Sequence, residues 1–365
     1  MDGRELQGSP TGTGRYLRNL LRVWGRDGRG SLHVYFNGPA PADDVLSSPA
    51  VRIRPLGQAA VRGVVWQERR LPPAALADGC QVFFSPAYSC PRRLPLPRVT
   101  AVHDLSFFSL PQDFTWLDGL RRRLGAQASL AVSAGVLACS DFTRREILGR
   151  FPGLEARVHH VPLGPDDDLP PAPGRDEARA RLGVSGPMVL AVGAILNRRR
   201  LPELLRAIAA LRGEHPGLLL DVVGENRTHP RLDLRALAES LGLGGTLRLS
   251  GFVAETDLAL RYAAADVACS LSDYEGFGLP ALEALCRGLP LVASRRPCLG
   301  EVFGEAALLV EPSDVPGIAA ALGRVLGDPL LRQDLLARGR ALASRFSWQR
   351  TADLTWGVLE SAARP

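Results

Sequence analysis

The chain has 365 residues, of which 46% are hydrophobic and 22% charged, with a formal net charge of +6 at pH 7. The length suits about two domains of roughly 150 residues each, and the composition excludes a largely disordered chain. The basic excess is small and dispersed, and all 44 basic residues are arginine, which favours anionic small molecules or an anionic membrane surface over nucleic acid.

Two further patterns indicate where the protein works. No apolar stretch of 18 residues and no secretory signal pattern is found. The six cysteines form no C-x-x-C pair, which is typical of reduced thiols. We therefore expect a cytoplasmic protein.

The chain opens with a glycine-rich turn, SPTGTGRYLRNLL at residues 9–21, which leads into a helix with no strand ahead of it. A doubly wound domain normally opens with a central strand. We therefore expect either that this domain lacks its first strand or that an apolar strand is encoded in frame directly upstream of Met1. The turn lacks the full G-x-G-x-x-G spacing, so a dinucleotide fingerprint is not supported.

Short apolar runs then alternate with longer amphipathic ones. Strands are predicted over residues 32–37, 51–56, 81–86, 98–104 and 136–140, and again over 187–193, 218–224, 246–251, 266–271 and 289–294. Helices are predicted over residues 113–133, 141–149, 201–213, 231–241, 256–264 and 279–288. This alternation predicts two doubly wound parallel sheets, each covered by helices on both faces.

A segment rich in proline and acidic residues, 166–186, is the predicted linker. It separates a first domain, residues 1–165, from a second, residues 187–345. Ligands of such sheets bind at the carboxyl ends of the strands, so a cleft between the domains is expected.

The segment SDYEGFGLPALEALCRG follows the predicted strand at 266–271. Proline favours the first helical position, which predicts a helix starting at Pro280, with Glu275 in the loop before it and Glu283 in its first turn. Glycines permit close approach by a ligand, and a helix start attracts anions. A nucleotide-sugar would satisfy these features; an ordinary capped helix in which Glu283 complements the helix dipole is the alternative.

Two other strand ends carry polar groups. Arg198, Arg199 and Arg200 follow the strand at 187–193, where guanidinium groups would neutralise a pyrophosphate without a metal. The alternative for this triplet is a solvated basic loop. His103 ends another predicted strand and is expected to face the cleft, with a structural histidine as the alternative.

The predicted helix over 113–133 carries a basic patch, Arg121–Arg123, close to Trp116. This patch could contact anionic lipid or an acceptor, and a solvated helix face is the alternative. Neither the three acidic residues at 166–168 nor the adjacent histidines at 159–160 predicts a metal site. The former lie in the linker, and neighbouring side chains of a strand point to opposite faces.

The segment SDYEGFGLPALEALCRGLPLVAS resembles the Glu-x7-Glu signature of the group 1 family of retaining, two-domain glycosyltransferases with the GT-B fold. DGRELQGSPTGTGRYLRNLL, VTAVHDLSFF, VGAILNRRRLPELLRAI and SGFVAETDLALRYAAADVACS resemble other parts of the family in the same order, so the resemblance covers nearly the whole chain. Within this family, the chain is similar to bacterial mannosyltransferase-like members. The ending, residues 346–365, resembles the family's terminal helix, which crosses back onto the first domain.

The resemblance implies roles for the second domain. Glu283 would hold the ribose hydroxyls, Glu275 would contact the transferred sugar, and Val253 would lie near the nucleobase. Three backbone amides would lie near the sugar and diphosphate, those of Phe277, Gly278 and Leu279.

The resemblance also implies which residues neutralise the negative charge of the donor phosphates and which residues of the first domain contact the donor. Arg199 takes the position of a phosphate-binding lysine, and Arg198 would assist it. From the first domain, His103 would contact the sugar, while Gly12 and Gly14 would approach the donor phosphates.

The resulting hypothesis is metal-independent, cofactor-free transfer of a hexose from a nucleotide-diphosphate sugar to a glycan, lipid-linked or small-molecule hydroxyl. The hypothesis includes an anionic membrane, contacted peripherally, as a further partner. It does not include nucleic acid. One alternative is a non-catalytic nucleotide-sugar-binding protein with a degraded or truncated first domain. A nicotinamide oxidoreductase is disfavoured because no strand carries the glycine fingerprint.

Overall fold

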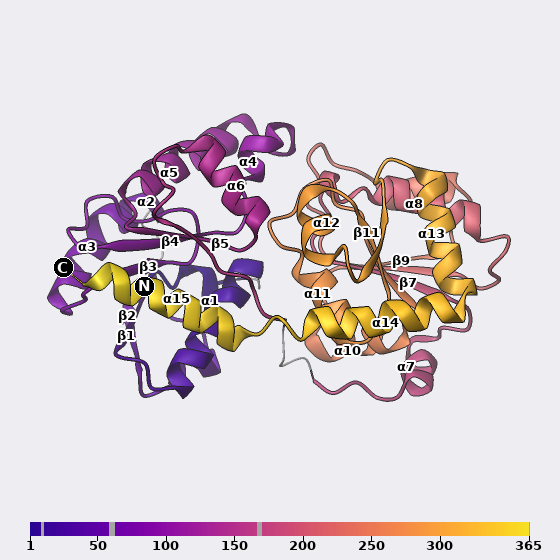
Figure 1. Ribbon diagram of the computed structural model, residues 1–365, viewed down its shortest axis with the longest axis horizontal. Helices are drawn as coiled ribbons and strands as arrows, with labels where there is room; N and C mark the ends of the chain where they lie inside the picture. The colour runs from indigo at the N-terminus through magenta and orange to yellow at the C-terminus, as the bar shows by residue number, and fades with distance from the viewer. Residues whose placement is uncertain (9–10, 58–62, 166–169, 365) are drawn as a thin grey trace. The chain divides into compact units, whose positions relative to one another are not determined.

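The computed structural model describes residues 1–8, 11–57, 63–165 and 170–364. The chain divides into two compact units (Figure 1). Unit 1 comprises Met1–Ser109, Trp116–Gly164 and Phe346–Pro365, and unit 2 comprises Leu110–Thr115 and Pro165–Arg345.

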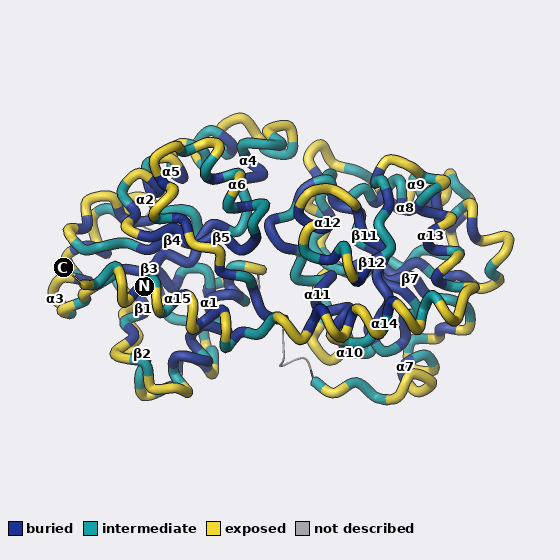
Figure 2. The backbone as a smooth tube through the Cα atoms, in the orientation of Figure 1, coloured by how far each residue is buried: buried dark blue, intermediate teal, exposed yellow. Residues whose placement is uncertain are grey.

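Unit 2 contains a six-stranded, fully parallel sheet in the order β12-β11-β10-β7-β8-β9. Its strands are β7 (Met188–Val192), β8 (Leu219–Val223), β9 (Leu247–Ser250), β10 (Val267–Ser270), β11 (Leu291–Ser294) and β12 (Ala307–Val310). The central strands are almost entirely apolar because helices cover both faces (Figure 2). The strand order reverses between β7 and β10, and ligands of doubly wound sheets bind at such a reversal.

The helices of unit 2 pack around this sheet. They are α7 (Arg175–Leu182), η5 (Asn197–Arg199), α8 (Leu201–Leu211), α9 (Leu234–Ser240), α10 (Glu255–Ala264), α11 (Leu279–Cys286), α12 (Pro297–Phe303), α13 (Val315–Gly327) and α14 (Pro329–Ala343), with η4 (Pro111–Asp113) grouped with them. One core joins α8 and α13 to the strands through buried leucine, isoleucine and valine side chains, including Ile208, Val222 and Ile318.

The predicted linker over 166–186 contains α7, which packs against α10. The guanidinium groups of Arg175 and Arg179 both reach the carboxylate of Asp266, at 2.5 and 3.3 Å. These ion pairs attach α7 to unit 2. Residues 175–182 are therefore part of the folded unit rather than of a linker.

Unit 1 contains two parallel sheets, β1-β2 and β3-β4-β5-β6. Their strands are β1 (Leu32–Phe36), β2 (Val51–Pro55), β3 (Phe83–Ser85), β4 (Arg98–Val102), β5 (Gly135–Ala138) and β6 (Val158–His160). The helices are η1 (Arg4–Leu6), α1 (Gly12–Arg26), η2 (Asp44–Ser47), α2 (Gly63–Val65), the π-helix η3 (Trp66–Arg70), α3 (Leu71–Ala77), α4 (Ser106–Ser109), α5 (Trp116–Val132), α6 (Asp141–Arg150) and α15 (Trp348–Ala363).

Residues 1–3 join the two sheets of unit 1. The Tyr35 amide of β1 donates to the Met1 carbonyl at 3.0 Å, and the Asp2 amide donates to the Phe84 carbonyl of β3 at 3.1 Å. Asp2 and Tyr35 form an isolated parallel bridge. Ahead of α1, residues 1–3 therefore pair with β1 and β3 through these backbone contacts. The expected apolar strand upstream of Met1 stays a prediction.

The last helix, α15, packs against α1 at the opposite end of the sequence. The Trp24 indole nitrogen donates to the Ala352 carbonyl at 3.2 Å, and its ring lies 5.5 Å from that of Trp356. The Thr351 hydroxyl donates to the Pro162 carbonyl at 2.7 Å. These contacts make the end of the chain part of unit 1.

Candidate functional site

The loop after β7 holds Arg199 against the backbone. Its Nη1 donates to the carbonyl of Val192, the last residue of β7, at 2.7 Å. Gly193 has φ of +115°, and a Cβ there would lie 2.3 Å from Nη1 of Arg199. Only glycine therefore leaves room for the guanidinium group at the end of this strand.

Arg200 adopts a left-handed conformation, with φ of +53°, between η5 and α8. Its guanidinium group pairs with Asp273 and lies 3.3 Å from Glu203. The Asp273 amide also donates to the Arg198 carbonyl at 2.8 Å. Non-glycine residues in a left-handed conformation concentrate at functional sites. Here the ion pair of Arg200 with Asp273 and the backbone hydrogen bond from Asp273 to Arg198 join the loops after β7 and β10.

Glu275 lies in the loop after β10, and the structure brings it together with Arg199. Nη2 of Arg199 lies 3.2 Å from Oε1 of Glu275, with side chains 18% and 13% exposed. The Ser272 hydroxyl donates to the same oxygen at 2.8 Å. A carboxylate and a cation thus share the edge of the sheet where its strand order reverses.

Helix α11 begins at Leu279, one residue before the predicted start. Gly278 precedes it with φ of +96°, and a Cβ there would lie 2.7 Å from Leu299. Phe277 is buried against Phe303, with ring centroids 6.3 Å apart. Pro280 carries no N–H, and the amides of Ala281 and Leu282 donate to the Gly278 carbonyl at 3.0 and 3.2 Å. An anion at this helix start would therefore bind the amides of Gly278 and Leu279.

Glu283 is the fifth residue of α11 rather than part of its first turn. Its side chain is buried, and the Tyr262 hydroxyl of α10 donates to its Oε2 at 3.1 Å. A ribose held by Glu283 would therefore share the carboxylate with Tyr262. The ribose role of Glu283 stays a prediction, and sequence reasoning did not identify Tyr262.

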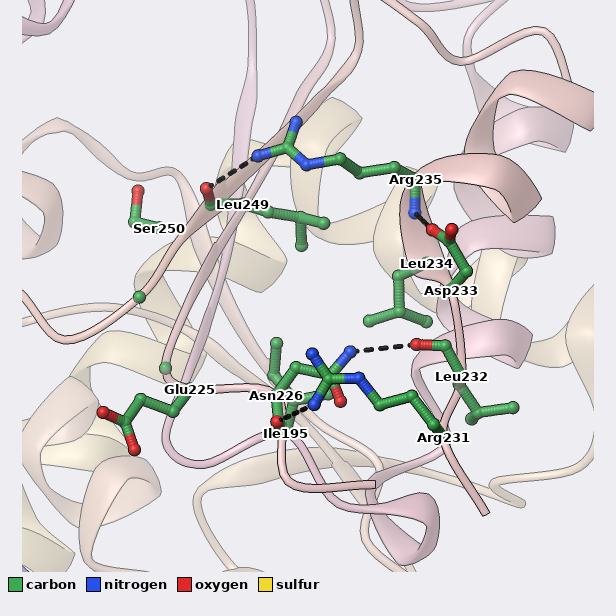
Figure 3. Close-up of a pocket in the computed structure, with 12 residues that line it drawn as sticks. Ile195, Glu225, Asn226, Arg231, Leu232, Asp233, Leu234, Arg235, Leu249 and Ser250 are labelled. Carbon is green, nitrogen blue, oxygen red and sulfur yellow. Dashed lines mark hydrogen bonds between the residues drawn. The ribbon is translucent and has the colours of Figure 1, made fainter. Parts of the chain in front are cut away.

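A cavity of about 660 Å³ lies at the carboxyl ends of β8 and β9 (Figure 3). Ile195, Leu232, Leu234 and Leu249 supply apolar walls, and the charged or amide side chains that line it are Glu225, Asn226, Arg231, Asp233 and Arg235. The lining ends at Gly251, two residues before Val253, which is half-buried. This cavity is large enough for a nucleobase.

The predicted site residues of unit 1 make mostly backbone contacts. The carbonyl of Pro86 can only accept, so the His103 Nε2, 2.8 Å away, carries the hydrogen. Burial lowers the pKa of His103 more than this hydrogen bond raises it, which favours the neutral ring. The ring packs edge-on against Tyr16, with centroids 4.7 Å apart.

Gly12 and Gly14 open α1 in different environments. The Gly14 amide donates to the Thr11 side chain at 2.9 Å, and a Cβ on Gly14 would lie 2.3 Å from the Glu5 carbonyl oxygen. A Cβ on Gly12 would meet no atom within 4 Å. The packing of unit 1 therefore requires glycine at position 14 and not at position 12.

Other groups singled out by sequence contribute little to this site. The acidic residues at 166–168 lie outside the described residues. His159 and His160 are both exposed on β6, and His160 Nδ1 lies 3.9 Å from Asp141. In the part of the chain that the structure describes, no group of three or more His, Cys, Asp or Glu side chains is arranged to hold a metal, and no helix has the length and apolarity to span a bilayer.

Comparisons with known proteins identify the family of this chain. The family model described as "Glycosyl transferases group 1" matches residues 175–342. Over 283 residues, 73% of this chain and 71% of the relative, the chain is 32% identical to the O-antigen chain mannosyltransferase B of Escherichia coli. Over 232 residues, 62% of this chain, it is 36% identical to the MMP alpha-(1->4)-mannosyltransferase of Mycolicibacterium hassiacum, and the match spans 54% of that relative.

The structure is also similar to that of Alr3699/HepE from Anabaena in complex with UDP and glucose, with a TM-score of 0.76. The two are 17% identical, and the similarity covers 99% of this chain and 98% of that one. Together, the fold, the family model and the Escherichia coli relative show that the chain belongs to the group 1 glycosyltransferase family and has the GT-B fold.

Proposed function

We propose that this chain transfers a hexose from a nucleotide-diphosphate sugar to a hydroxyl group with retention of anomeric configuration. The observation that carries the proposal is the ion pair between Arg199 and Glu275, and Glu275 lies four residues before the start of α11. It joins a cation suited to a diphosphate and a carboxylate suited to sugar hydroxyls at neighbouring strand ends. Both relatives are named mannosyltransferases, which favours mannose or a similar hexose.

The chemistry follows from these groups. The bond between the anomeric carbon and the diphosphate oxygen breaks, and its electron pair leaves with the diphosphate. The acceptor oxygen forms the new bond on the same face and gives its proton to the departing phosphate. Arg198, Arg199 and the amides at the start of α11 would stabilise the developing negative charge, so the transfer needs neither a metal nor a cofactor.

The donor would extend along unit 2. Glu283 would bind the ribose, and the base would lie in the cavity of about 660 Å³ beside Val253. UDP in the HepE structure supports a nucleotide in this fold, and both GDP- and UDP-sugars are candidates here. For His103, Gly12 and Gly14 of unit 1, the roles toward the sugar and the donor phosphates stay predictions.

The acceptor would be a glycan, a lipid-linked saccharide or a small polyol. The name of the Escherichia coli relative supports a growing polysaccharide. In our proposal the donor nucleotide-sugar is cytoplasmic, and the protein would therefore act in the cytoplasm. Nucleic acid is not a proposed partner.

A membrane surface is proposed as a further partner because α5 carries exposed apolar side chains. Trp116 and Leu117 are each 71% exposed, and Leu124 is 57% exposed. At 3.6 residues per turn these three lie within about 100° of one another around α5, and the centre of this arc lies about 120° from that of the buried residues Gly119, Ala126 and Leu130. Arg121, whose side chain is 73% exposed, flanks them and favours anionic lipid.

Vesicle sedimentation tests the membrane contact. The protein should sediment with vesicles of phosphatidylglycerol and phosphatidylcholine, and less with phosphatidylcholine alone. Replacing Trp116, Leu117 and Leu124 by serine should abolish sedimentation, while Leu330→Ser, at a residue 78% exposed on α14, should not. Equal sedimentation of both variants would contradict this contact.

A thermal-shift screen with GDP-mannose, UDP-glucose and dTDP-glucose tests the proposed donor. The matching nucleotide-sugar should raise the melting temperature, since binding to the folded state stabilises it. Release of free sugar or its transfer to an added acceptor then separates an enzyme from the non-catalytic binding protein. Stabilisation without any turnover would favour the binding protein, and no stabilisation by any donor would contradict both.

A further inference from the structure

Ser272 is a buried hydroxyl directly beside the proposed sugar site. It follows β10 by two residues and is 1% exposed. Its Oγ donates to Oε1 of Glu275 at 2.8 Å, across one turn of the loop. A buried hydroxyl rarely lacks a partner, and here the partner is a predicted functional carboxylate.

A cation lies beside the same oxygen. Nη2 of Arg199 lies 3.2 Å from Oε1 of Glu275, while Nη1 of Arg199 is fixed by the Val192 carbonyl at 2.7 Å. Arg199 and Ser272 both line a cavity of only about 20 Å³, which leaves room for a single water. Oε1 is therefore fixed from two sides in a closely packed wall.

The two oxygens of Glu275 consequently differ. Oε1 accepts the hydrogen bond from Ser272 and forms the ion pair with Arg199, whereas none of the hydrogen bonds found among the described residues reaches Oε2. The side chain keeps 13% of its surface exposed, so Glu275 is neither sealed in the core nor free to rotate. A carboxylate oxygen has room for two hydrogen bonds, which suits two neighbouring hydroxyls of one sugar ring.

We infer that Ser272 is a positioning residue: it holds Oε1 of Glu275 together with Arg199, so that Oε2 accepts hydroxyl groups of the transferred hexose. This inference rests on the proposed function. It gives Arg199 a second role, because the cation expected to face the diphosphate also orients the sugar-binding carboxylate. Ser272 touches no substrate itself and acts through Glu275.

The expected effect separates the sugar from the nucleotide. In Ser272→Ala, Glu275 loses its hydrogen bond from Ser272, keeps only the ion pair with Arg199 and can rotate. Misplacement of this kind lowers turnover by roughly 10- to 100-fold. Affinity for GDP or UDP alone should not change. The preference for the nucleotide-sugar over the bare nucleotide, measured by calorimetry as the ratio of the two dissociation constants, should shrink.

Two further variants isolate the hydroxyl. Ser272→Thr keeps the hydroxyl and should recover most of the turnover. Ser129→Ala removes a buried hydroxyl from unit 1, where it accepts from the Cys90 amide at 3.0 Å, and should leave both the ratio and the turnover unchanged. Melting temperatures of the three variants report any loss of folding separately.

The calorimetry uses GDP-mannose with GDP and UDP-glucose with UDP, and turnover is followed as release of the nucleoside diphosphate. An unchanged ratio and unchanged turnover in Ser272→Ala would overturn the inference and leave the proposed function standing. Equal loss of nucleotide and nucleotide-sugar affinity would also overturn it, since that pattern indicates a purely structural serine. If the wild-type protein binds neither nucleotide-sugar, the proposed function and the inference both fail.

Discussion

The two units hold their predicted site residues in different ways. In unit 2 the loops after β7 and β10 are joined through side chains, by the pair of Arg199 with Glu275 and the pair of Arg200 with Asp273. In unit 1 the His103 ring is held by a backbone carbonyl, and Gly14 packs against another. Substitutions of site residues in unit 2 should therefore change the charge of the site and its binding of the donor. Those in unit 1 should act mainly by changing how side chains pack against the backbone.

The largest effect is expected where the charge network of unit 2 is broken. Arg199→Ala removes both the partner of Glu275 and a cation for the diphosphate. Turnover of the donor should fall by roughly 10²–10³-fold, the cost of losing one group that stabilises developing charge. Steady-state kinetics would measure it, and Arg340→Ala, on the exposed side of α14, is the matched control. Equal kinetics of the two variants would remove Arg199 from the site.

A smaller effect is expected at the buried carboxylate of α11. Glu283→Ala should weaken binding of the donor by roughly 10- to 100-fold, because hydrogen bonds to a charged group contribute about 1.5–3 kcal/mol. Tyr262→Phe removes only the hydroxyl that donates to Glu283 and should cost far less affinity. Calorimetry with the nucleoside diphosphate measures both. Unchanged affinity in Glu283→Ala would leave this residue with a structural role alone.

A pair of glycines sharpens the contrast between the units. Gly278→Ala forces a side chain into a left-handed conformation 2.7 Å from Leu299, and should cost about 1–3 kcal/mol of stability. Gly12→Ala meets no atom within 4 Å, so stability should stay constant while donor turnover falls. Thermal melting and kinetics of both variants test this. A stability loss in Gly12→Ala would show that position 12 serves the fold.

The smallest effect is expected from His103. Burial lowers its pKa below the ordinary value of about 6.5, so the unfolded chain binds the proton more readily than the folded one. Its contribution to stability is complete above pH 6.5 and is lost as the pH falls below that value. His103→Gln should therefore lose less stability than the wild type between pH 7.5 and pH 5.5. Parallel pH dependence in chemical denaturation would contradict the lowered pKa.

Sequence patterns predicted most of the fold because its signals are local. The apolar run at 187–193 became β7, and the glycine and proline in EGFGLPALE placed Glu275 in a loop and Glu283 on a helix. The first helical residue was misplaced by one position because Pro280 occupies the second place in the helix rather than the first.

The missed features depend on contacts between distant residues. Arg199 and Glu275 are neighbours only because β7 and β10 pair side by side in the sheet. The same pairing brings the Asp273 amide to the Arg198 carbonyl, and α10 brings Tyr262 to Glu283. The content of proline and acidic residues predicts a linker where the structure has α7, whereas the attachment of α7 comes from Asp266, far along the chain.

The packing of α15 on α1 makes unit 2 an insertion, in topological terms, within the chain of unit 1. Unit 2 is almost one continuous stretch, Pro165–Arg345, while unit 1 is assembled from both sides of it. Deleting the last helix would uncover Trp24 and the Pro162 carbonyl without removing a residue of unit 2. Unit 2, which carries the proposed nucleotide-binding residues, could therefore survive a shortened chain, and unit 1 could not.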